Sequence, residues 1–350
     1  MYKKILINGY FVNNLGDDLF VITLCQRYGE CIFFIIESEP YTNTFKSFKN
    51  IILCKRNEIE NLKIDLQILL GGSLFMQPND VKYIDYKYEG TVKERISSNI
   101  PFIIIGANFG PYTERKHFEL YKSWFSTLDD ICFRDKQSYE LFKDLQNIRW
   151  APDVVFNHKI NKYKRIKAVS ISCIYNNKRM GLAEYSQEKY LKQLAEISME
   201  YIKQGFEIKL VSFCIHQEDT KAVEEIISYI PKQYRKCVRW SEYNGNNLNE
   251  FLSFFLETQY ILGTRFHSIV LGWLAKVPTF PIVYNIKTDN VLKSYGFKGS
   301  YINIENIDKT TFNFIDKNRK DNYVLETSQL IQMANEQFDF LDRYEESVKV

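Results

Sequence analysis

Hydrophobic residues follow two different patterns along this chain, and the patterns alternate from the first residues onward. Short apolar runs rich in β-branched and aromatic side chains, such as residues 4–8 and 168–172, are typical of buried parallel strands. Longer stretches between them, such as residues 187–204, repeat apolar side chains every three or four positions, which predicts amphipathic helices. The alternation predicts an α/β fold with parallel sheets built from βαβ units.

The same pattern predicts individual elements in both halves of the chain. In the first half we expect strands at 4–8, 31–36, 51–53, 66–70, 102–105 and 131–133. In the second half we expect strands at 168–172, 207–213, 237–239, 260–262 and 280–283. Helices are expected at 19–28, 136–145, 187–204, 219–229, 249–256 and 268–275.

The length of the chain and a polar stretch near its middle predict two domains. Its 350 residues are too many for one ordinary core and suit two domains of about 150 residues each. Because residues 157–165 are polar, basic and without periodicity, we place a linker at 158–166, between an N-terminal domain at 1–157 and a C-terminal domain at 167–320. Residues 321–350 are expected to contain an amphipathic helix, at about 327–344, that packs back on the body.

Composition narrows the classes of protein without indicating a function. Hydrophobic residues make up 45% and charged residues 25% of the chain, as in ordinary soluble globular proteins. The net charge of +3 does not favour nucleic-acid binding. Seven cysteines without a C-x-x-C pair favour reduced thiols, a cytoplasmic location and no structural metal. No apolar run approaches the ~20 residues of a membrane span, so any membrane contact would be peripheral.

The strongest candidate for a functional site is the stretch Gly263-Thr264-Arg265-Phe266-His267. It lies between a predicted strand and a predicted helix, where free backbone N–H groups and the helix dipole favour an anion. The Arg265 guanidinium offers a fork for carboxylate or phosphate, and residue 267 is a histidine, the residue type whose unperturbed pKa lies nearest neutrality. We therefore expect anion binding and proton transfer at the same turn.

Three glycine-containing segments of the first half also follow predicted strands. They are the segment from Gly9 to Asp18, the loop Leu70-Gly71-Gly72-Ser73, and the loop Gly106-Ala107-Asn108-Phe109-Gly110-Pro111. Glycine lets a backbone approach a ligand closely, and α/β sheets place ligand crevices at the carboxyl ends of their strands. Each segment alone is explained equally well by a turn or a helix cap, but together they indicate a ligand-binding edge.

Three charged residues allow both a structural and a functional interpretation. Arg134 either binds an anion at the sheet edge or pairs with Asp135. Asp153 acts as a base or, as we favour, fixes a turn. Lys287 reaches the same edge as Arg265 or is a solvated surface lysine.

Taken in order, these motifs resemble those of the polysaccharide pyruvyl transferase family. The set spans residues 5 to about 290 and consists of Gly9-Tyr10-Phe11 with Asn14-x-Gly16-Asp17, Gly71-Gly72, Gly106 with Gly110-Pro111, Arg134-Asp135, Pro152-Asp153, Arg265-x-His267 and Lys287. The chain departs from the family pattern at Ser73, where a third glycine is common, and at Ala107-Asn108. These departures bear on acceptor contacts more than on the arginine and histidine positions.

The resemblance implies two Rossmann-like domains in a glycosyltransferase-B-like arrangement, with a cleft between the domains. It also implies phosphoenolpyruvate as the donor, a glycan sugar as the acceptor, and a cyclic pyruvate ketal as the product. The acceptor would be a lipid-linked intermediate of a bacterial surface or capsular polysaccharide (exopolysaccharide), at the cytoplasmic face of the membrane. Phosphoenolpyruvate is then a co-substrate, and no cofactor, metal or nucleic acid is expected. The basic linker touches anionic lipid or is simply solvated.

The resemblance and the chemistry of the donor suggest roles for the candidate residues. The carboxylate and phosphate of the donor are expected to bind at Arg134, Arg265, Phe266 and Lys287. His267 is the candidate general acid, and Asp17 is the candidate acceptor of a hydroxyl proton. The candidate acceptor-binding residues are Asn14, Gly16, Gly72, Ser73 and Asn108.

Two other functions stay open from the sequence. A glycosyltransferase of the same architecture would bind a nucleotide-sugar diphosphate near Arg265 and Lys287. A non-catalytic glycan-binding protein would keep the same site without using it.

Overall fold

The computed structural model describes residues 3–175 and 185–347, and the chain divides into two compact units. The first unit comprises Met1–Phe11, Asp17–His158 and Ser328–Val350, and the second comprises Val12–Gly16 and Lys159–Thr327. This division differs from the expected boundaries in two places, because residues 12–16 belong to the second unit and the chain returns to the first unit at Ser328. Residues 159–166 form neither helix nor strand.

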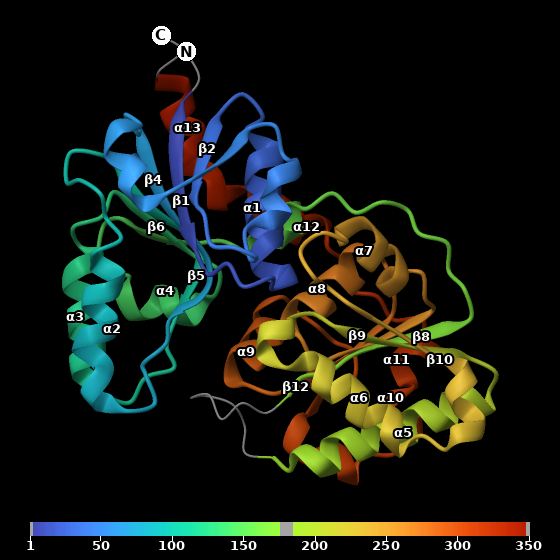
Figure 1. Cartoon of the computed structure of the whole chain (residues 1–350). Helices are drawn as coiled ribbons and strands as arrows, with labels where there is room; N and C mark the ends of the chain where they lie inside the picture. Colours follow the sequence, from blue (N-terminus) through green and yellow to red (C-terminus); the bar gives the residue numbers. More distant parts are fainter. Residues whose placement is uncertain (1–2, 176–184, 348–350) are drawn as a thin grey trace. The chain divides into compact units, whose positions relative to one another are not determined.

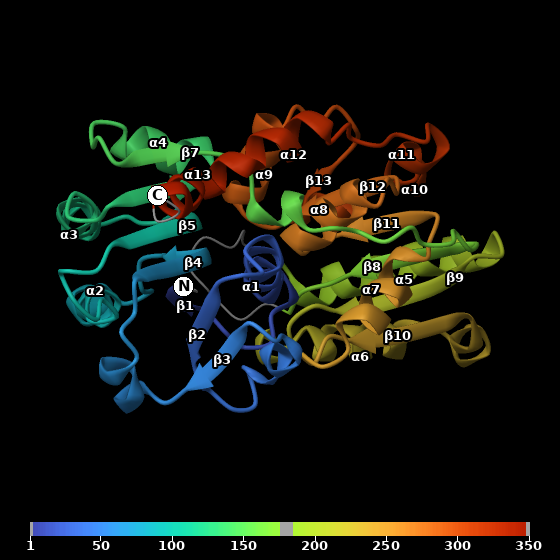
Figure 2. The same cartoon turned by 90° about the horizontal axis from the view of Figure 1, so that it is seen from above.

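The first unit is built on a parallel seven-stranded sheet. Its strands are β1 (Lys4–Gly9), β2 (Ile32–Ile36), β3 (Ile51–Cys54), β4 (Leu66–Phe75), β5 (Phe102–Phe109), β6 (Asp130–Phe133) and β7 (Ile148–Trp150). They lie in the order β3-β2-β1-β4-β5-β6-β7 (Figure 2). The order reverses between β1 and β4, which is where sheets of this kind leave a crevice for ligands. The sequence pattern predicted the first six strands and missed β7, which is only three residues long.

Helices and short 3-10 turns cover this sheet. The helices are α1 (Leu15–Arg27), α2 (Ile84–Val92), α3 (Arg115–Phe125) and α4 (Lys136–Phe142), and the turns are η1 (Asn43–Ser47), η2 (Arg56–Asn61), η3 (Val81–Tyr83) and η4 (Val154–Asn157). Helices α2 and α3 were not predicted. The buried face of α3 is largely aromatic, and its Tyr121 and Phe125 pack with Phe109 and Phe142 in one cluster. Aromatic residues are enriched in strands, so the sequence of this segment did not point clearly to a helix.

Glycines bend β4 and β5 inside the sheet, where the sequence predicted loops beyond the strand ends. Gly71 and Gly72 have φ angles of +71° and +76°, and Gly106 has +71°, a region that residues with side chains rarely adopt. A Cβ atom on Gly71 would lie 1.9 Å from the Phe20 ring of α1. The glycines therefore let α1 pack closely against strands that continue to Phe75 and Phe109.

The C-terminal segment belongs to the first unit. In place of the single helix expected at 327–344, the chain forms α12 (Ser328–Ala334), the turn η8 (Asn335–Phe338) and α13 (Asp339–Ser347). Figure 1 shows α12 and α13, in red, in the same unit as the blue strands β1 and β2. Of the five apolar residues expected to share the packed face, Leu330, Ala334, Phe338 and Leu341 are buried and Ile331 is partly buried.

Gln337 anchors this segment to the sheet and interrupts its helical pattern. The fully buried side chain donates hydrogen bonds to the carbonyl oxygens of Ala151 (2.8 Å) and Pro152 (3.1 Å). Its Oε1 atom accepts a hydrogen bond from the backbone N–H of Gly106 (2.9 Å). One side chain thus satisfies backbone groups that would otherwise be buried without partners.

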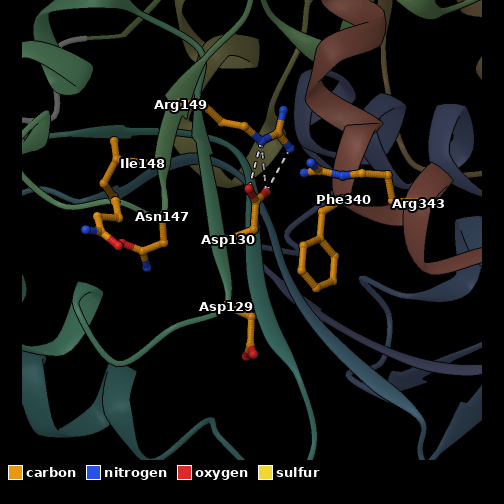
Figure 3. Close-up of a pocket in the computed structure, with 8 residues that line it drawn as sticks. Asp129, Asp130, Asn147, Ile148, Arg149, Phe340 and Arg343 are labelled. Atoms are coloured by element: carbon orange, nitrogen blue, oxygen red, sulfur yellow. Dashed lines mark hydrogen bonds and ion pairs between the residues drawn. The ribbon is translucent and has the colours of Figure 1, made fainter. Parts of the chain in front are cut away.

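Arg149 of β7 makes a second anchor. Its guanidinium pairs with Asp130 of β6 (2.8 Å) and also donates to the main-chain carbonyl of Gln337 (3.1 Å). Figure 3 shows the pair beside Phe340 and Arg343 of α13, in a pocket of about 450 Å³. The pocket lies where β6 and β7 begin, at the edge opposite the carboxyl ends of the strands. We therefore interpret it as part of the attachment of the C-terminal segment.

The second unit contains a parallel six-stranded sheet. Its strands are β8 (Ala168–Ser172), β9 (Glu207–Ser212), β10 (Val238–Glu242), β11 (Tyr260–Gly263), β12 (Thr279–Val283) and β13 (Ile302–Asn303), in the order β10-β9-β8-β11-β12-β13 (Figure 2). The order reverses between β8 and β11, so the end of β11 lies at the expected ligand position. The sequence pattern predicted every one of these strands except the two-residue β13.

Helices of the second unit follow its strands. They are α5 (Gln187–Lys203), α6 (Asp219–Tyr229), α7 (Leu248–Leu256), α8 (Phe266–Leu274), α9 (Ile286–Ser294), α10 (Phe312–Ile315) and α11 (Lys317–Lys320), with turns η5 (Ile215–Gln217), η6 (Lys232–Cys237) and η7 (Ile304–Lys309). The first four were predicted within about two residues of their observed ends, whereas α9, α10 and α11 were not. The last two are single turns, too short to show a period.

Candidate functional site

The predicted anion-binding turn lies where β11 ends and α8 begins. β11 ends at Gly263, and α8 starts at Phe266 with Arg265 as its N-cap residue. A Cβ atom on Gly263 would lie 2.8 Å from the Ile269 side chain and 2.9 Å from the Ser268 hydroxyl. Glycine at this position therefore allows the helix to approach the strand closely enough for a tight turn.

Buried hydroxyl groups hold the backbone of this turn. The Oγ atom of Ser172, at the end of β8, accepts hydrogen bonds from the N–H groups of Thr264 (3.0 Å) and Arg265 (3.2 Å). The Ser268 hydroxyl lies 2.6 Å from the same oxygen, and the Tyr190 hydroxyl lies 2.8 Å from Oγ1 of Thr264. We expected free N–H groups at this junction, but the N–H groups of Thr264 and Arg265 are bonded within the protein.

Arg265 is nearly buried and is held by two acceptors, one from η5 and one from the first turn of α6. Its Nε atom donates to Asp219 Oδ2 (2.8 Å), Nη2 donates to Oδ1 of the same carboxylate, and Nη1 donates to Gln217 Oε1 (2.5 Å). Burial lowers the pKa of Arg265, but the fully buried Asp219 raises it more strongly, and the net shift is upward. The guanidinium therefore stays charged in one fixed orientation. No motif in the sequence indicated Asp219 as the partner of Arg265.

His267 lies directly against the backbone of Gly16. A Cβ atom on Gly16 would lie 1.8 Å from Nδ1 of His267, so only glycine fits beside the ring. Asn14 forms a β-bridge with Cys214, and its Oδ1 atom accepts a hydrogen bond from the N–H of Gly16 (3.3 Å). Within the second unit, two candidate acceptor-binding residues thus lie beside the candidate general acid.

The remaining two candidates of the second unit lie at the same sheet edge. The Phe266 ring packs edge-on against the His267 ring, with centroids 5.1 Å apart. Lys287 is partly buried in the first turn of α9, which follows β12, the strand beside β11. Lys287 therefore lies at the carboxyl ends of the same strands as Arg265.

In the first unit, Arg134 is hydrogen-bonded to two of the candidate acceptor-binding residues, Ser73 and Asn108. Its Nη2 atom donates to Asn108 Oδ1 (2.8 Å) and to Ser73 Oγ (3.5 Å), and the Ser73 hydroxyl also donates to Asn108 (3.0 Å). Its Nη1 atom donates to the fully buried Asp153 (3.0 Å). A Cβ atom on Gly72 would lie 2.9 Å from Oδ1 of Asp17.

Acidic neighbours determine the charge state of Arg134. Burial lowers its pKa, but Asp153 and Asp17 raise it, and the net shift is upward. Asp153 also accepts a hydrogen bond from the N–H of Val155 (2.9 Å), so it fixes the turn as we favoured and pairs with Arg134 as well. Asp135, the partner considered from the sequence, caps α4 through the backbone N–H of Ser138 (2.8 Å).

The chain matches a known protein family over most of its length. A family model for polysaccharide pyruvyl transferases matches residues 14–286. The chain belongs to the polysaccharide pyruvyl transferase family. The matched region contains Arg134, Arg265 and His267 and ends one residue before Lys287. No curated protein matches the sequence of this polysaccharide pyruvyl transferase family member.

Solved structures resemble this family member along its whole length. A structure of S. aureus MnaA with UDP has a TM-score of 0.57 at 13% identity and covers 98% of this chain and 97% of its own. Anabaena HepE with UDP and glucose gives 0.59 at 9% identity, with 100% of both chains covered. The UDP-GlcNAc 2-epimerase of Neisseria meningitidis with UDP-GlcNAc gives 0.59 at 9% identity, covering 98% and 100%. These similarities show the fold, which is glycosyltransferase-B-like, as the sequence predicted.

Two further observations bear on membrane and metal sites. Among residues 3–175 and 185–347, no helix is both long enough and apolar enough to cross a bilayer. The same described residues contain no group of three or more His, Cys, Asp or Glu side chains arranged to hold a metal ion.

Proposed function

We propose that this family member transfers the pyruvyl group of phosphoenolpyruvate to two hydroxyl groups of a glycan sugar, forming a cyclic ketal and releasing phosphate. The observation that carries the proposal is the arrangement at the end of β11, where a charged, fixed Arg265 lies two residues from the imidazole of His267. The donor has a carboxylate and a phosphate, and arginine binds both groups through paired hydrogen bonds. The family match gives independent support.

The proposed reaction makes three bonds at the donor and breaks two, the π bond of its C=C double bond and the C–O bond to phosphate. A proton adds to the methylene carbon of phosphoenolpyruvate, and the two sugar oxygens bond to the neighbouring carbon, whose bond to the phosphate oxygen breaks. Of the two hydroxyl protons, one balances the proton gained by carbon and the other leaves with phosphate. His267 is the proposed general acid for the carbon, and Asp17 is the proposed acceptor of a hydroxyl proton.

The donor's negative charge is assigned to cationic side chains in this proposal. Arg265 and Lys287 of the second unit, with the Phe266 ring, are proposed to contact the donor, and Arg134 of the first unit is proposed to contribute as well. Because these cations neutralise the leaving phosphate, the proposed reaction needs neither a metal ion nor a cofactor. The proposed acceptor is a lipid-linked intermediate of a bacterial surface or capsular polysaccharide, modified at the cytoplasmic side of the membrane.

A donor screen with the full chain tests the proposal. Purified protein is incubated with phosphoenolpyruvate and a set of methyl glycosides and oligosaccharides, and acceptor-dependent phosphate release is measured. The product should carry a ketal methyl signal in its NMR spectrum. UDP release from a UDP-sugar, without use of phosphoenolpyruvate, would instead identify a glycosyltransferase, which the nucleotide-bound structural neighbours make the second candidate.

The non-catalytic alternative needs a cellular test. A strain that carries His267→Ala should lose the pyruvate ketal from its glycan if the protein is the enzyme. An unchanged glycan and an unchanged phenotype would favour a binding role without catalysis.

A further inference from the structure

A cavity in the first unit lies where the strand order of the sheet reverses. Its volume is about 470 Å³, and it is lined by the ends of β1 and β4, by residues just beyond β2 and β3, and by one face of α2. Reversal points of parallel sheets are ligand positions, and small-molecule sites typically have volumes of ~300–1,000 Å³. The cavity is lined by none of the residues assigned above to the donor or the acceptor.

Hydrogen-bonding groups are built into one wall of this cavity. Asn8, which is only 7% exposed, donates its amide N–H to Glu94 Oε2 (2.9 Å), and Arg56 donates to both oxygens of that carboxylate (2.8 and 2.9 Å). The bond to Glu94 fixes the orientation of the amide. Its Oδ1 atom is buried, and among the residues that the structure describes no donor reaches it. A hydroxyl group of a ligand in the cavity would satisfy this acceptor.

Helix α2 forms a second wall of the cavity, and one position of this wall, Gly90, has no side chain. Lys87, Gly90 and Thr91 of α2 line the cavity at the spacing of one helix face, and Glu94 follows just after the helix. The Lys87 ammonium donates to the carbonyl of Met76, and burial lowers the pKa of Lys87 to about 8. A Cβ atom on Gly90 would meet no atom within 4 Å. Glycine is unfavourable inside a helix, and here it widens the cavity.

Aromatic and apolar groups complete the lining. Tyr10 is 40% exposed, Phe11 follows it, and the side chains of Leu69 and Leu74 of β4 add apolar surface. Sugar rings combine apolar C–H faces with hydroxyl groups, so they need aromatic or apolar surface and hydrogen-bonding groups together. Because Arg56 is already paired with Glu94, the wall favours a neutral polar ligand over a phosphorylated one.

We infer that this cavity binds a neutral sugar ring of the acceptor glycan. The inference rests on the proposed function, which requires a sugar acceptor. Asn8 and Glu94 would bind hydroxyl groups, Tyr10 would pack on a ring face, and Gly90 would leave room for the ring. The cavity would hold the glycan and take no part in the bond-making steps.

Gly90→Trp tests the inference, with Gly90→Ala as the matched control. Both changes add side-chain atoms at a position where a Cβ meets nothing, but only tryptophan is large enough to fill the cavity. Saturation-transfer NMR of the full chain is recorded with the methyl glycosides of glucose, galactose, mannose and N-acetylglucosamine at millimolar concentration. We expect at least one glycoside to bind the parent and Gly90→Ala, and to bind Gly90→Trp at least about tenfold more weakly, a loss of ~1.4 kcal/mol. Equal binding to Gly90→Trp, or no binding of any glycoside to the parent, would overturn the inference.

A footprinting measurement needs no variant and covers the case in which Gly90→Trp does not fold. Acylation of Lys87 is followed by mass spectrometry with and without the bound glycoside, and the exposed Lys93 at the end of α2 serves as control. The glycoside should slow acylation of Lys87 severalfold and leave Lys93 unchanged. The same rate at Lys87 with and without glycoside would also overturn the inference.

Different experiments would contradict the sugar-binding cavity and the proposed reaction. If the parent binds a glycoside in the cavity but never uses phosphoenolpyruvate, the proposed reaction is wrong while the sugar site stands. If Gly90→Trp forms the ketal with the parent's KM for the acceptor, the cavity assignment is wrong while the reaction stands.

Discussion

His267 is the single residue on which the proposed chemistry depends most. Glutamine is similar in size and keeps hydrogen-bonding groups, but it cannot donate a proton to carbon as an imidazolium can. We predict that His267→Gln lowers kcat by about 10²–10⁴-fold while the affinity for phosphoenolpyruvate changes little. Phosphate-release kinetics and calorimetric titration with the donor measure the two quantities. A variant that turns over at the parent rate would exclude the general-acid role.

Gly16 offers a test of where the imidazole must lie. In Gly16→Ala the new Cβ would overlap Nδ1 of His267, so the ring must move. We predict that kcat falls at least about tenfold, because small misplacements of a catalytic group are costly, while the variant stays folded. Gly29→Ala is the control, because no atom lies within 4 Å of a Cβ at that position. Equal kcat for Gly16→Ala and the parent would show that the contact is irrelevant to turnover.

Asp219 fixes Arg265, and its removal should affect the fold as well as the site. In Asp219→Asn the guanidinium stays charged and buried but loses its counter-ion. We predict that the free energy of unfolding falls by roughly 3–5 kcal/mol. Chemical denaturation measures this change, and Asp308→Asn, whose carboxylate pairs only loosely with Lys189 (3.4 Å), is the control. If both variants were equally stable, the buried pair would not matter to the fold.

At the scale of single residues, the sequence indicated which side chains are candidates for the chemistry, but it did not indicate which residues bond to them. Arg265 and His267 could be singled out because they lie two positions apart at a strand-to-helix turn. Asp219 lies 46 residues before Arg265, and Asn8 lies 86 residues before Glu94, so their contacts arise only in the folded chain. The proposed sugar cavity also has no single motif, since its polar residues come from β1, from the segments that follow β1, β2 and β3, and from α2 with the residues just after it.

Among the elements, central strands were predicted better than short or aromatic ones. β8 was predicted at its observed bounds because its residues are all buried and are either apolar or small. β7 and β13 lie at sheet edges with three and two residues, so neither shows a period. Gly71, Gly72 and Gly106 suggested loops because glycine usually marks a turn, whereas here they bend strands to admit α1 and η4.

The turn η8 gives a prediction at the scale of elements. Gln337→Ala would leave the N–H of Gly106 and the carbonyl of Ala151 buried without their present partner. Each such group costs about 1–3 kcal/mol, so the free energy of unfolding should fall by at least about 2 kcal/mol. Urea denaturation measures the change, and Gln332→Ala, at an exposed position of α12, is the control. Equal stability of the two variants would contradict the anchoring role of Gln337.

The molecule as a whole should lose stability in mild acid. His158, at the end of the first unit, is buried against the Thr23 hydroxyl, and burial lowers its pKa from 6.5 to about 4. Between these values the unfolded chain binds a proton that the folded chain does not, so stability falls as the pH drops through this window. The contribution is roughly 3 kcal/mol and is complete below about pH 4. Denaturation of the parent and His158→Gln at pH 7 and pH 4.5 checks this, and an equal loss in both proteins would contradict it.

Domain number could be predicted from length, but the path of the chain between the units could not. The linker was placed from composition, and residues 159–166 are indeed without regular structure. The transfer of residues 12–16 to the second unit depends on pairing with Cys214, and the return at Ser328 depends on Gln337. Both are contacts between distant parts of the sequence, which no local pattern records.

The return of the chain at Ser328 has a consequence for biosynthesis. Translation produces β1 to β7 before the second unit, but the side chain that bonds to Gly106 of β5 and to the carbonyl groups just after β7 is made only after the whole second unit. The unit whose strands are translated first is therefore completed last. Until residues 328–347 are made, a nascent chain keeps these backbone groups uncovered, and a truncation just before Ser328 would damage the first unit rather than the second.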